Sequence, residues 1–474
     1  MDLSGLLVVS NRGPLSFRLD ENRRPVSVGS AGGLAGTLHS TFKRSGATWV
    51  ACAMNEADRA AASDGLVNDE SLRLVMVDPD PETYRMAYNV ISNSTLWFAH
   101  HHLFDTPRRP RIDRRWMQAW DAYRRMNALF ADSVDAAASR SSTVLVQDYH
   151  LALLPAMLSE RRPDLSVVHF SHTPFADPFM LRVLPTAVVK ELLGGMAGSS
   201  GCGFHSRRWQ AAFLACCEDA GVAAPPTFVS PLAPDASDLE ERISAPEVGT
   251  AARRISELVG DRRVIVKVDR VEPSKNLLRA LWALDELLRE RPEWRRRVVL
   301  LALAYSSRQE LPEYLAYGTE AELLAKRVNE TWATADWTPV LFEVADDKDR
   351  SLAALTLYDV LLVNPIRDGL NLVAKEGPVV TAKDGALALS TEAGAYDELA
   401  GAAIGLNPFD ISQTATALGT CLDMPTEERA LRAAELKRLA TKRRPADWLH
   451  DQLAAARSTS GASTPPRGLG EVEQ

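Results

Sequence analysis

The chain has 474 residues, of which 46% are hydrophobic and 24% are charged, and its formal net charge is -8 at pH 7. This composition is typical of a folded globular protein, and the length suggests two large domains. The mildly acidic balance argues against a broad nucleic-acid-binding surface, and no apolar run reaches the roughly 18 residues that a membrane span requires.

Cysteine usage and the first residues both favour a cytoplasmic protein. The five cysteines are odd in number, and no spacing among them matches a zinc site or a redox pair. We therefore expect reduced thiols. The N-terminal segment lacks the basic region of a signal peptide and instead predicts a strand that starts almost at once.

Short apolar runs alternate with longer helical patterns along the chain. Buried strands are predicted at residues 6–10, 143–147, 166–170, 264–268, 298–304, 359–364 and 386–390. Helical spacing of apolar residues predicts helices over residues 116–134 and 277–288. This alternation favours an α/β fold with doubly wound parallel sheets and right-handed crossovers.

Residues 231–249 form the best candidate boundary between two such domains, because they hold three prolines and several acidic residues without an apolar period. We expect a first domain over 1–235 and a second over 250–455, facing each other across a cleft. The tail over 456–474, rich in small and polar residues, is expected to be disordered. Ligands of such sheets bind beyond the carboxyl ends of the strands, so the loops there are the candidate site.

The loop after the predicted strand at 359–364 carries the most informative motif, which includes Asp368-Gly369 and Asn371. A turn is expected at Asp368-Gly369, and a helix near Asn371, where free backbone N–H groups attract a phosphate. Asp368 could then bind sugar hydroxyls, and Glu376, about one and a half turns inside the helix, could bind a ribose. The same pattern also fits an ordinary strand–turn–helix connection with a solvated acid.

The loop after the predicted strand at 264–268 holds two cations, Arg270 and Lys275, and opens a helix at about Ser274. Arginine offers a planar fork to a phosphate, and lysine offers a point charge. With the helix terminus they suit a diphosphate. Two solvated cations are the alternative.

Near the N-terminus, Ser10-Asn-Arg-Gly-Pro14 follows the first strand, and Ser30-Ala-Gly-Gly-Leu34 follows a short loop. Paired glycines let a backbone approach an anion closely, and Arg12 could close such a site. The pattern is neither a Walker loop nor a dinucleotide fingerprint.

Two further strand ends carry polar side chains, Asp148 and His172. A carboxylate and an imidazole at adjacent strand ends could handle a sugar or a proton. A capping aspartate and a structural histidine are the alternative. The consecutive run at residues 100–102 is all histidine, but neighbours in a run do not share a face, so we predict no metal site there.

Together these motifs resemble the trehalose-6-phosphate synthase family of retaining glycosyltransferases, which has a GT-B fold of two facing Rossmann-like domains. The matching segments follow the family's order from residue 6 to about 455. They are Ser10-Asn-Arg-Gly-Pro, Ser30-Ala-Gly-Gly-Leu, Tyr88-Asn, Ser92-Asn, Leu96-Trp97, Asp148-Tyr-His, His172-Thr-Pro-Phe, Arg270 with Lys275, and Arg367-Asp-Gly-Leu-Asn-Leu-Val-Ala-Lys-Glu376.

The resemblance implies roles for individual residues. The catalytic group would be Arg270, Lys275, Asp148 and His172. The donor would be bound through its diphosphate, sugar and ribose by Arg270, Lys275, Asp368, Gly369, Asn371, Leu372, Val373, Glu376 and His172. The acceptor would be surrounded by Arg12, Gly32, Trp49, Tyr88, Trp97, Asp148 and Arg308, with Arg12, Tyr88 and Arg308 aimed at its phosphate.

The implied reaction moves glucose from UDP-glucose or GDP-glucose to glucose 6-phosphate, giving α,α-trehalose 6-phosphate with retention by front-face attack. The nucleotide sugar is a co-substrate. No cofactor and no metal are expected, because arginine, lysine and a helix dipole would act on the leaving diphosphate. No nucleic-acid or membrane partner is expected, and a homo-oligomer is compatible with the resemblance.

Two segments depart from the family pattern. The usual Arg-Leu-Asp-Tyr-x-Lys-Gly is here Arg270-Val-Glu-Pro-Ser-Lys275-Asn276, and the usual Trp-x-Gly-Trp-Ser-Gly is Trp49-Val-Ala-Cys-Ala-Met54. Both departures are similar to validamycin-type pseudoglycosyltransferases, which couple a nucleotide-linked cyclitol to an aminocyclitol phosphate. That reaction, transfer to another acceptor such as glycerol phosphate, and a non-catalytic sugar-phosphate-binding regulator are the alternative functions.

Overall fold

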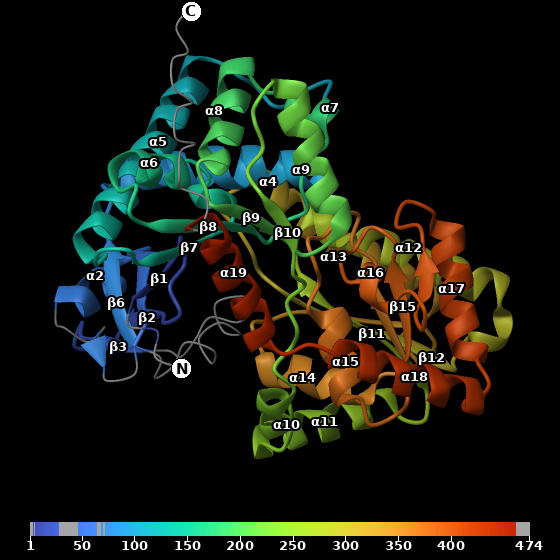
Figure 1. Cartoon of the computed structure of the whole chain (residues 1–474). Helices are drawn as coiled ribbons and strands as arrows, with labels where there is room; N and C mark the ends of the chain where they lie inside the picture. Colours follow the sequence, from blue (N-terminus) through green and yellow to red (C-terminus); the bar gives the residue numbers. More distant parts are fainter. Residues whose placement is uncertain (1–2, 4, 28–45, 64–67, 70–71, 461–474) are drawn as a thin grey trace, which may run out of the picture.

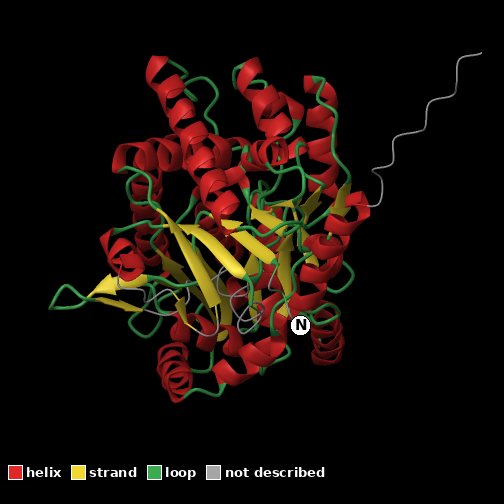
Figure 2. Ribbon diagram, turned by 60° about the vertical axis from the view of Figure 1, so that its left-hand side comes forward, coloured by secondary structure: helices red, strands yellow, loops and turns green. Residues whose placement is uncertain are grey.

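The computed structural model describes residues 3, 5–27, 46–63, 68–69 and 72–460. Two parallel β-sheets lie beside each other and are surrounded by helices (Figure 1, Figure 2). The first sheet takes its strands from residues 6–229, and the second from residues 263–406. The predicted α/β class with two doubly wound, Rossmann-like units is confirmed.

The first sheet has the strand order β10-β9-β8-β7-β1-β4-β6-β5, and its neighbouring strands are parallel except for β5 and β6. Strands near its centre are apolar on both faces, because helices cover a parallel sheet on both sides. The strands are β1 (Leu6–Ser10), β4 (Thr48–Cys52), β5 (Asn68–Asp69), β6 (Leu72–Val77), β7 (Thr143–Gln147), β8 (Ser166–Ser171), β9 (Gly201–Phe204) and β10 (Thr227–Val229). A separate antiparallel ribbon pairs β2 (Phe17–Leu19) with β3 (Pro25–Ser27).

The helices that pack around the first sheet include the one predicted over residues 116–134. It begins at the cap Asp113, whose carboxylate accepts a hydrogen bond from the Trp116 backbone N–H. An 11-residue π-helix, η1, was not predicted. The elements are α2 (Glu56–Ser63), α3 (Pro81–Arg85), η1 (Met86–Leu96), α4 (Trp97–His101), α5 (Arg114–Ala137), η2 (Tyr149–Leu151), α6 (Leu154–Arg161), α7 (Pro178–Leu181), α8 (Thr186–Ala197) and α9 (Arg207–Ala220).

The second sheet is parallel throughout, with the order β13-β12-β11-β14-β15-β16. In its strand β12, residues 298–304 are all buried and only Tyr305, at the carboxyl end, is exposed. The strands are β11 (Arg263–Arg270), β12 (Val298–Tyr305), β13 (Val340–Val344), β14 (Val360–Val363), β15 (Ala386–Ser390) and β16 (Ile404–Leu406).

The helices around the second sheet include α12, which buries a stripe of leucines and alanines as its sequence spacing predicts. The elements are α11 (Pro246–Val259), η3 (Pro273–Lys275), α12 (Leu277–Glu290), η4 (Pro292–Trp294), α13 (Pro312–Trp332), α14 (Lys348–Leu357), α15 (Val373–Val380), α16 (Tyr396–Leu399), α17 (Ile411–Asp423) and α18 (Thr426–Ala440).

The segment predicted as a boundary without an apolar period contains a helix, α10 (Ala236–Ile243). Leu239 is the one residue that α10 buries, so its apolar pattern is too short to be recognised in the sequence. The cap is Asp235, whose side chain accepts from the Asp238 backbone N–H.

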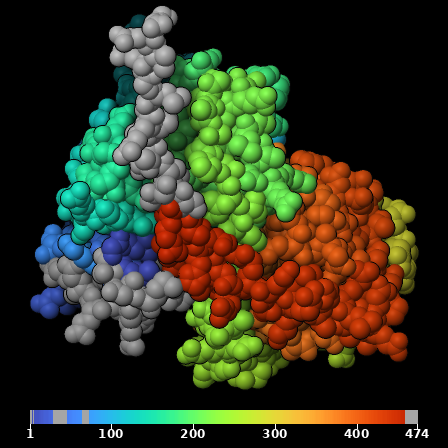
Figure 3. Space-filling view, viewed as in Figure 1, coloured from blue at the N-terminus to red at the C-terminus, as the bar shows by residue number. Residues whose placement is uncertain are grey.

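The final described helix, α19 (Pro445–Ser460), returns to the first sheet after the second sheet is complete. It packs against β7, β8 and β9, and it buries Trp448 and Leu449 there. Figure 3 shows its red surface between the green and blue first part of the chain and the orange second part. The two units are therefore joined by two chain crossings.

Two further findings concern the chain as a whole. No helix within the described ranges combines the length and the apolar character needed to cross a membrane. All five cysteines lie in these ranges, and each is a buried free thiol.

Candidate functional site

The carboxyl end of β11 brings the two predicted donor-side cations into one loop. Lys275 ends the short helix η3, and its Nζ lies 2.5 Å from Oδ2 of Asp368 and 4.0 Å from Oδ1 of Asp269. Burial opposes the charge on Lys275, but Asp368 and Asp269 outweigh that effect, so the pKa of Lys275 lies above its ordinary value. The lysine is therefore a fixed cation at the edge of the second sheet.

A buried polar network behind this loop ties β11 to β14. Lys267 Nζ donates to Oδ2 of Asp269 and to Oδ1 of Asn364, each at 2.8 Å. The Asn276 side chain donates to the carbonyls of Asn364 (2.9 Å) and Pro408 (2.7 Å). Asn276 has a φ of 60°, a left-handed conformation that asparagine tolerates.

The loop after β14 places Asp368 beside the start of helix α15. Asp368 Oδ2 accepts a hydrogen bond from Asn371 Nδ2 at 3.1 Å, and Asn371 Oδ1 accepts from the backbone N–H of Ala374, also at 3.1 Å. Leu372 is the cap of α15, and Val373 is its first residue. The helix thus begins two residues later than predicted.

The later start of α15 changes the position of Glu376. This residue lies in the first turn of the helix rather than one and a half turns inside it. Burial raises the pKa of its carboxyl group above the ordinary value. Its role toward a ribose stays a prediction.

The same loop contacts the first sheet at Gly369. A Cβ on Gly369 would lie 1.9 Å from the carbonyl oxygen of His172, so only glycine permits this approach. The indole N–H of Trp209 donates to the Gly369 carbonyl at 3.0 Å. The predicted donor loop is therefore packed against the end of β8 from the other unit.

Asp148 follows β7 in a strained backbone conformation, with φ 69° and ψ 171°. Such a conformation costs about 1–3 kcal/mol for a residue other than glycine and is concentrated at functional sites. Its Oδ1 accepts from the His172 backbone N–H at 3.1 Å. Burial raises the pKa of Asp148 to about 6, although the N–H groups of His172, Tyr149 and Thr173 oppose the shift.

Arg308 reaches from the second unit into an aromatic cluster of the first. Its guanidinium lies 3.9 Å from the centroid of the Trp97 ring, and it donates to the hydroxyls of Tyr314 (2.6 Å) and Tyr149 (3.2 Å). Arg270 lies over the same ring at 5.3 Å. Arg270, predicted on the donor side, and Arg308, predicted on the acceptor side, thus both lie over the Trp97 ring.

Glu272 holds these two arginines together, and the sequence did not single it out. Its carboxylate is fully buried and lies 3.2 Å from Arg270 and 3.7 Å from Arg308. Burial opposes its charge, but the arginines hold the pKa of Glu272 at about 2. Its Oε2 has no hydrogen-bond partner among the described residues. Its place in the sequence, two residues after Arg270 in the same motif, is the signal that could have identified Glu272.

The remaining predicted acceptor residues that the structure describes belong to the first unit. Tyr88 is on η1, and its ring stacks on Tyr84 (5.1 Å) and His150 (5.7 Å). Arg12 is exposed in the loop after β1. Trp49 is buried in β4 and donates its indole N–H to Ser10 Oγ at 2.8 Å.

Gly32 falls outside the described residues, as does the rest of the predicted glycine loop at 30–34. Its role stays a prediction. Within the ranges that the structure does describe, no group of three or more His, Cys, Asp or Glu residues is arranged to hold a metal ion.

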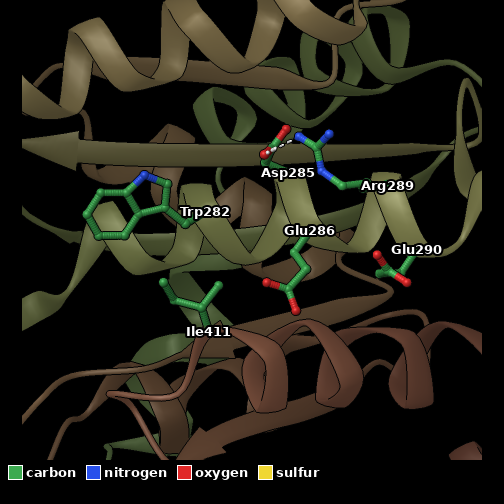
Figure 4. Close-up of a pocket in the computed structure, with 6 residues that line it drawn as sticks. All are labelled: Trp282, Asp285, Glu286, Arg289, Glu290 and Ile411. Carbon is green, nitrogen blue, oxygen red and sulfur yellow. Dashed lines mark hydrogen bonds and ion pairs between the residues drawn. The ribbon is translucent and has the colours of Figure 1, made fainter.

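A separate open hollow of about 440 Å³ lies between α12 and α17 (Figure 4). Its lining is Trp282, Asp285, Glu286, Arg289, Glu290 and Ile411. None of the predicted site residues lines it. The candidate site is therefore the polar cluster where the two sheet edges meet.

Comparison with known proteins identifies relatives along almost the whole chain. The model of a family described as "Glycosyltransferase family 20" matches residues 4–458. An α,α-trehalose-phosphate synthase (UDP-forming) of Dictyostelium discoideum is 31% identical over 94% of this chain and 61% of its own length. One from Aspergillus niger is 31% identical over 94% of this chain and 88% of its own length. The chain therefore spans about three fifths of the Dictyostelium relative.

Solved structures agree with these matches. A trehalose-6-phosphate enzyme from E. coli bound with UDP-2-fluoro glucose has a TM-score of 0.82 and 27% identity, covering 98% of this chain and all of its own. An α,α-trehalose-phosphate synthase (UDP-forming) of Burkholderia xenovorans in complex with glucose-6-phosphate has a TM-score of 0.82 and 25% identity, covering 95% and 99%. The two-unit arrangement is thus the GT-B fold of these enzymes.

Proposed function

Because this chain belongs to glycosyltransferase family 20, we propose that it moves glucose from a nucleoside diphosphate glucose to glucose 6-phosphate, forming α,α-trehalose 6-phosphate. One observation carries the proposal. Arg270 ends β11 and Arg308 follows β12 in the second unit, and both lie over Trp97 of the first unit. A diphosphate and a sugar phosphate would meet at such a junction.

On the donor side, Arg270 and Lys275 neutralise the charge that grows on the departing diphosphate. Electrostatic stabilisation of this kind is a large contribution to catalysis when the charges are already in place. The start of α15 adds the positive end of a helix dipole beside Asp368. Asp368 and Gly369 are placed to orient the donor sugar, and Glu376 to bind its ribose.

On the acceptor side, Asp148 accepts hydrogen bonds from sugar hydroxyls, and Arg12, Tyr88 and Arg308 bind the phosphate. Ionised Asp148 serves as an acceptor of hydrogen bonds, so its pKa of about 6 favours function above that pH. The acceptor hydroxyl attacks from the face that the diphosphate leaves, and its proton passes to the leaving phosphate. Glucose is thereby transferred with retention, and no protein nucleophile takes part.

The division of labour follows the two units. Residues 1–235 would form the acceptor domain, and residues 250–455 the donor domain. UDP is favoured as the nucleotide because the relatives' names specify UDP-forming enzymes. A cyclitol phosphate is the second candidate acceptor, since β4 and the residues after it depart from the family pattern at Cys52 and Met54.

The test is product identification without added metal. The purified chain is incubated with glucose 6-phosphate and either UDP-glucose or GDP-glucose, and products are identified by mass spectrometry. A phosphorylated non-reducing disaccharide is expected, with faster release of UDP than of GDP. Tight nucleotide binding without any disaccharide would contradict the proposed acceptor. Binding without release of a nucleoside diphosphate from any sugar acceptor would instead indicate a regulator.

A further inference from the structure

Three buried side chains and the half-buried His172 form a hydrogen-bonded row that leads from the last helix to the candidate site. Gln147 Nε2 donates to Oε1 of Gln452 on α19 at 3.3 Å. Gln147 Oε1 lies 2.9 Å from Nε2 of His172, and His172 Nδ1 lies 3.0 Å from Nε2 of His205. The row joins residues 305 positions apart in the sequence. We call it the Gln452–His205 row.

The row leaves the His172 ring no free nitrogen. Burial lowers the pKa of His172 well below its ordinary value and that of His205 to about 3, so both rings are neutral. A neutral imidazole has one donor and one acceptor nitrogen. Both nitrogens of His172 are therefore occupied by Gln147 and His205, and the ring is fixed in orientation.

The main chain of His172 touches both halves of the candidate site. Its N–H donates to Asp148, on the acceptor side, at 3.1 Å. Its carbonyl lies against Gly369, on the donor side, where even a methyl group would not fit. A rotation of the ring that shifted this backbone would change the separation of the two sides.

Gln452 places a polar amide in a buried environment. It is fully buried, and its Nε2 has no hydrogen-bond partner in the described part of the chain. A buried donor without a partner is destabilising, so the one hydrogen bond that the Gln452 amide does make is the Oε1 contact with Gln147. The amide at this position is therefore directed at Gln147 and the row beyond it.

We propose that Gln452 is a positioning residue of the active site. It holds Gln147, and through Gln147 the ring of His172, so that the His172 backbone keeps Asp148 and the Gly369 loop at a fixed separation. The helix that ends the described chain thereby sets the geometry between donor and acceptor without touching either. This inference rests on the proposed function for its kinetic consequence, but the row itself can be tested separately.

The kinetic test uses Gln452→Met, which keeps length and removes the amide. We expect kcat to fall about tenfold, because misalignment acts on the transition state. The KM for the nucleotide sugar should stay within about twofold, since Arg270 and Lys275 are on the other unit. The matched control is Asp451→Asn, which loosens the same helix at Ser230 and Arg443 and leaves the row intact. Equal losses in both variants would overturn the proposal.

A double-mutant cycle separates the row from general packing. Gln147→Met should lower kcat as much as Gln452→Met, and the double variant should be no worse than either single one, because the residues act as a unit. Independent, multiplying losses would overturn the proposal. Thermal melting verifies that each variant is folded under the assay conditions.

A spectroscopic readout does not depend on activity. In protein labelled with ¹⁵N-histidine, the His172 ring should stay neutral from pH 5 to 8. Its ring signals should shift in Gln452→Met and remain unchanged in Asp451→Asn. Unshifted signals in Gln452→Met would overturn the proposal. Shifted signals in a protein that transfers no sugar would count against the proposed function alone.

Discussion

The guanidinium of Arg308 lies 3.9 Å from the centre of the Trp97 indole, although the two residues belong to different units. A cation over a tryptophan in a desolvated place contributes about 2 kcal/mol. Arg308 has a φ of 47°, and hydrogen bonds to Tyr149 and Tyr314 fix its side chain. The contact means that the proposed acceptor pocket would be formed by both units together.

Replacing Arg308 by alanine should selectively weaken phosphorylated acceptors. We expect the KM for glucose 6-phosphate to rise about tenfold or more, because a charge-assisted hydrogen bond is lost. Use of free glucose should change little. Arg308→Lys should restore only part of the effect, since lysine lacks the planar fork. Steady-state kinetics with both acceptors measure this, and an unchanged preference would remove Arg308 from the phosphate site.

Removing either donor-side cation should slow turnover. Lys275→Ala and Arg270→Ala should each reduce kcat by about 10²–10³-fold, because each takes a charge from the leaving diphosphate. Lys326→Ala, at an exposed position of α13, is the control. Rates of nucleoside diphosphate release decide the matter, and near-normal rates in both variants would contradict the donor-site assignment.

Asp148→Asn should impair acceptor use and stabilise the protein at neutral pH. The folded pKa of about 6 is above the ordinary 3.8, so ionising Asp148 costs stability as the pH rises through this interval. Asparagine removes that cost, and we expect a gain of roughly 1–3 kcal/mol at pH 7.5 that vanishes near pH 4. Thermal melts of both proteins across this pH range measure the stability difference. A gain that grows toward low pH would contradict a raised pKa of Asp148.

The activity of the wild type should fall on the acid side as Asp148 becomes protonated. The acid limb of kcat/KM is expected near pH 6, since a protonated carboxyl accepts hydrogen bonds poorly. The pH profile should lose this limb in Asp148→Asn. Nucleotide binding, measured by calorimetry, should persist in the variant, and its loss would place Asp148 on the donor side.

Glu272→Gln should expose the repulsion between Arg270 and Arg308. Removing one partner of a buried charge group destabilises a protein by about 3–5 kcal/mol. Added UDP should raise the melting temperature more in this variant than in the wild type, because its diphosphate supplies the missing negative charge. Glu293→Gln, at an exposed position, is the control. An equal shift in all three proteins would separate Glu272 from the nucleotide site.

Gly369→Ala tests the close approach between the units. The new Cβ would collide with the His172 carbonyl, so the junction must open, at a cost of about 1–3 kcal/mol. The value of kcat/KM should fall by a larger factor than the fraction of folded protein does. Gly401→Ala meets no atom within 4 Å and is the control. Wild-type kcat/KM in Gly369→Ala would show that the contact does not set the catalytic geometry.

The sequence predicted the central strands well and the connections poorly. β1, β7 and β15 have their predicted bounds, because buried parallel strands are continuous apolar runs between polar turns. The short helix α10 and the π-helix η1 leave no comparable pattern. Local spacing therefore identified strands that are buried throughout and missed α10, which buries only Leu239.

Some residues of the candidate site could be predicted from the sequence, and others could not. Lys275 and Asp368 were recognisable because each follows a strand, and the structure pairs them directly. Glu272 was not, because its role depends on Arg308 from another loop. Glu376 was placed too deep in its helix, since the Asn371 side chain caps the first turn and delays the start of α15.

The return of α19 to the first sheet has a consequence for synthesis on the ribosome. Phe170, at the end of β8, packs on Trp448 at a ring distance of 5.2 Å, yet Trp448 is translated 278 residues later. Domains generally fold as units while the chain emerges, N-terminal first. The first unit must therefore wait, with this apolar edge uncovered, until the whole second unit has left the exit tunnel.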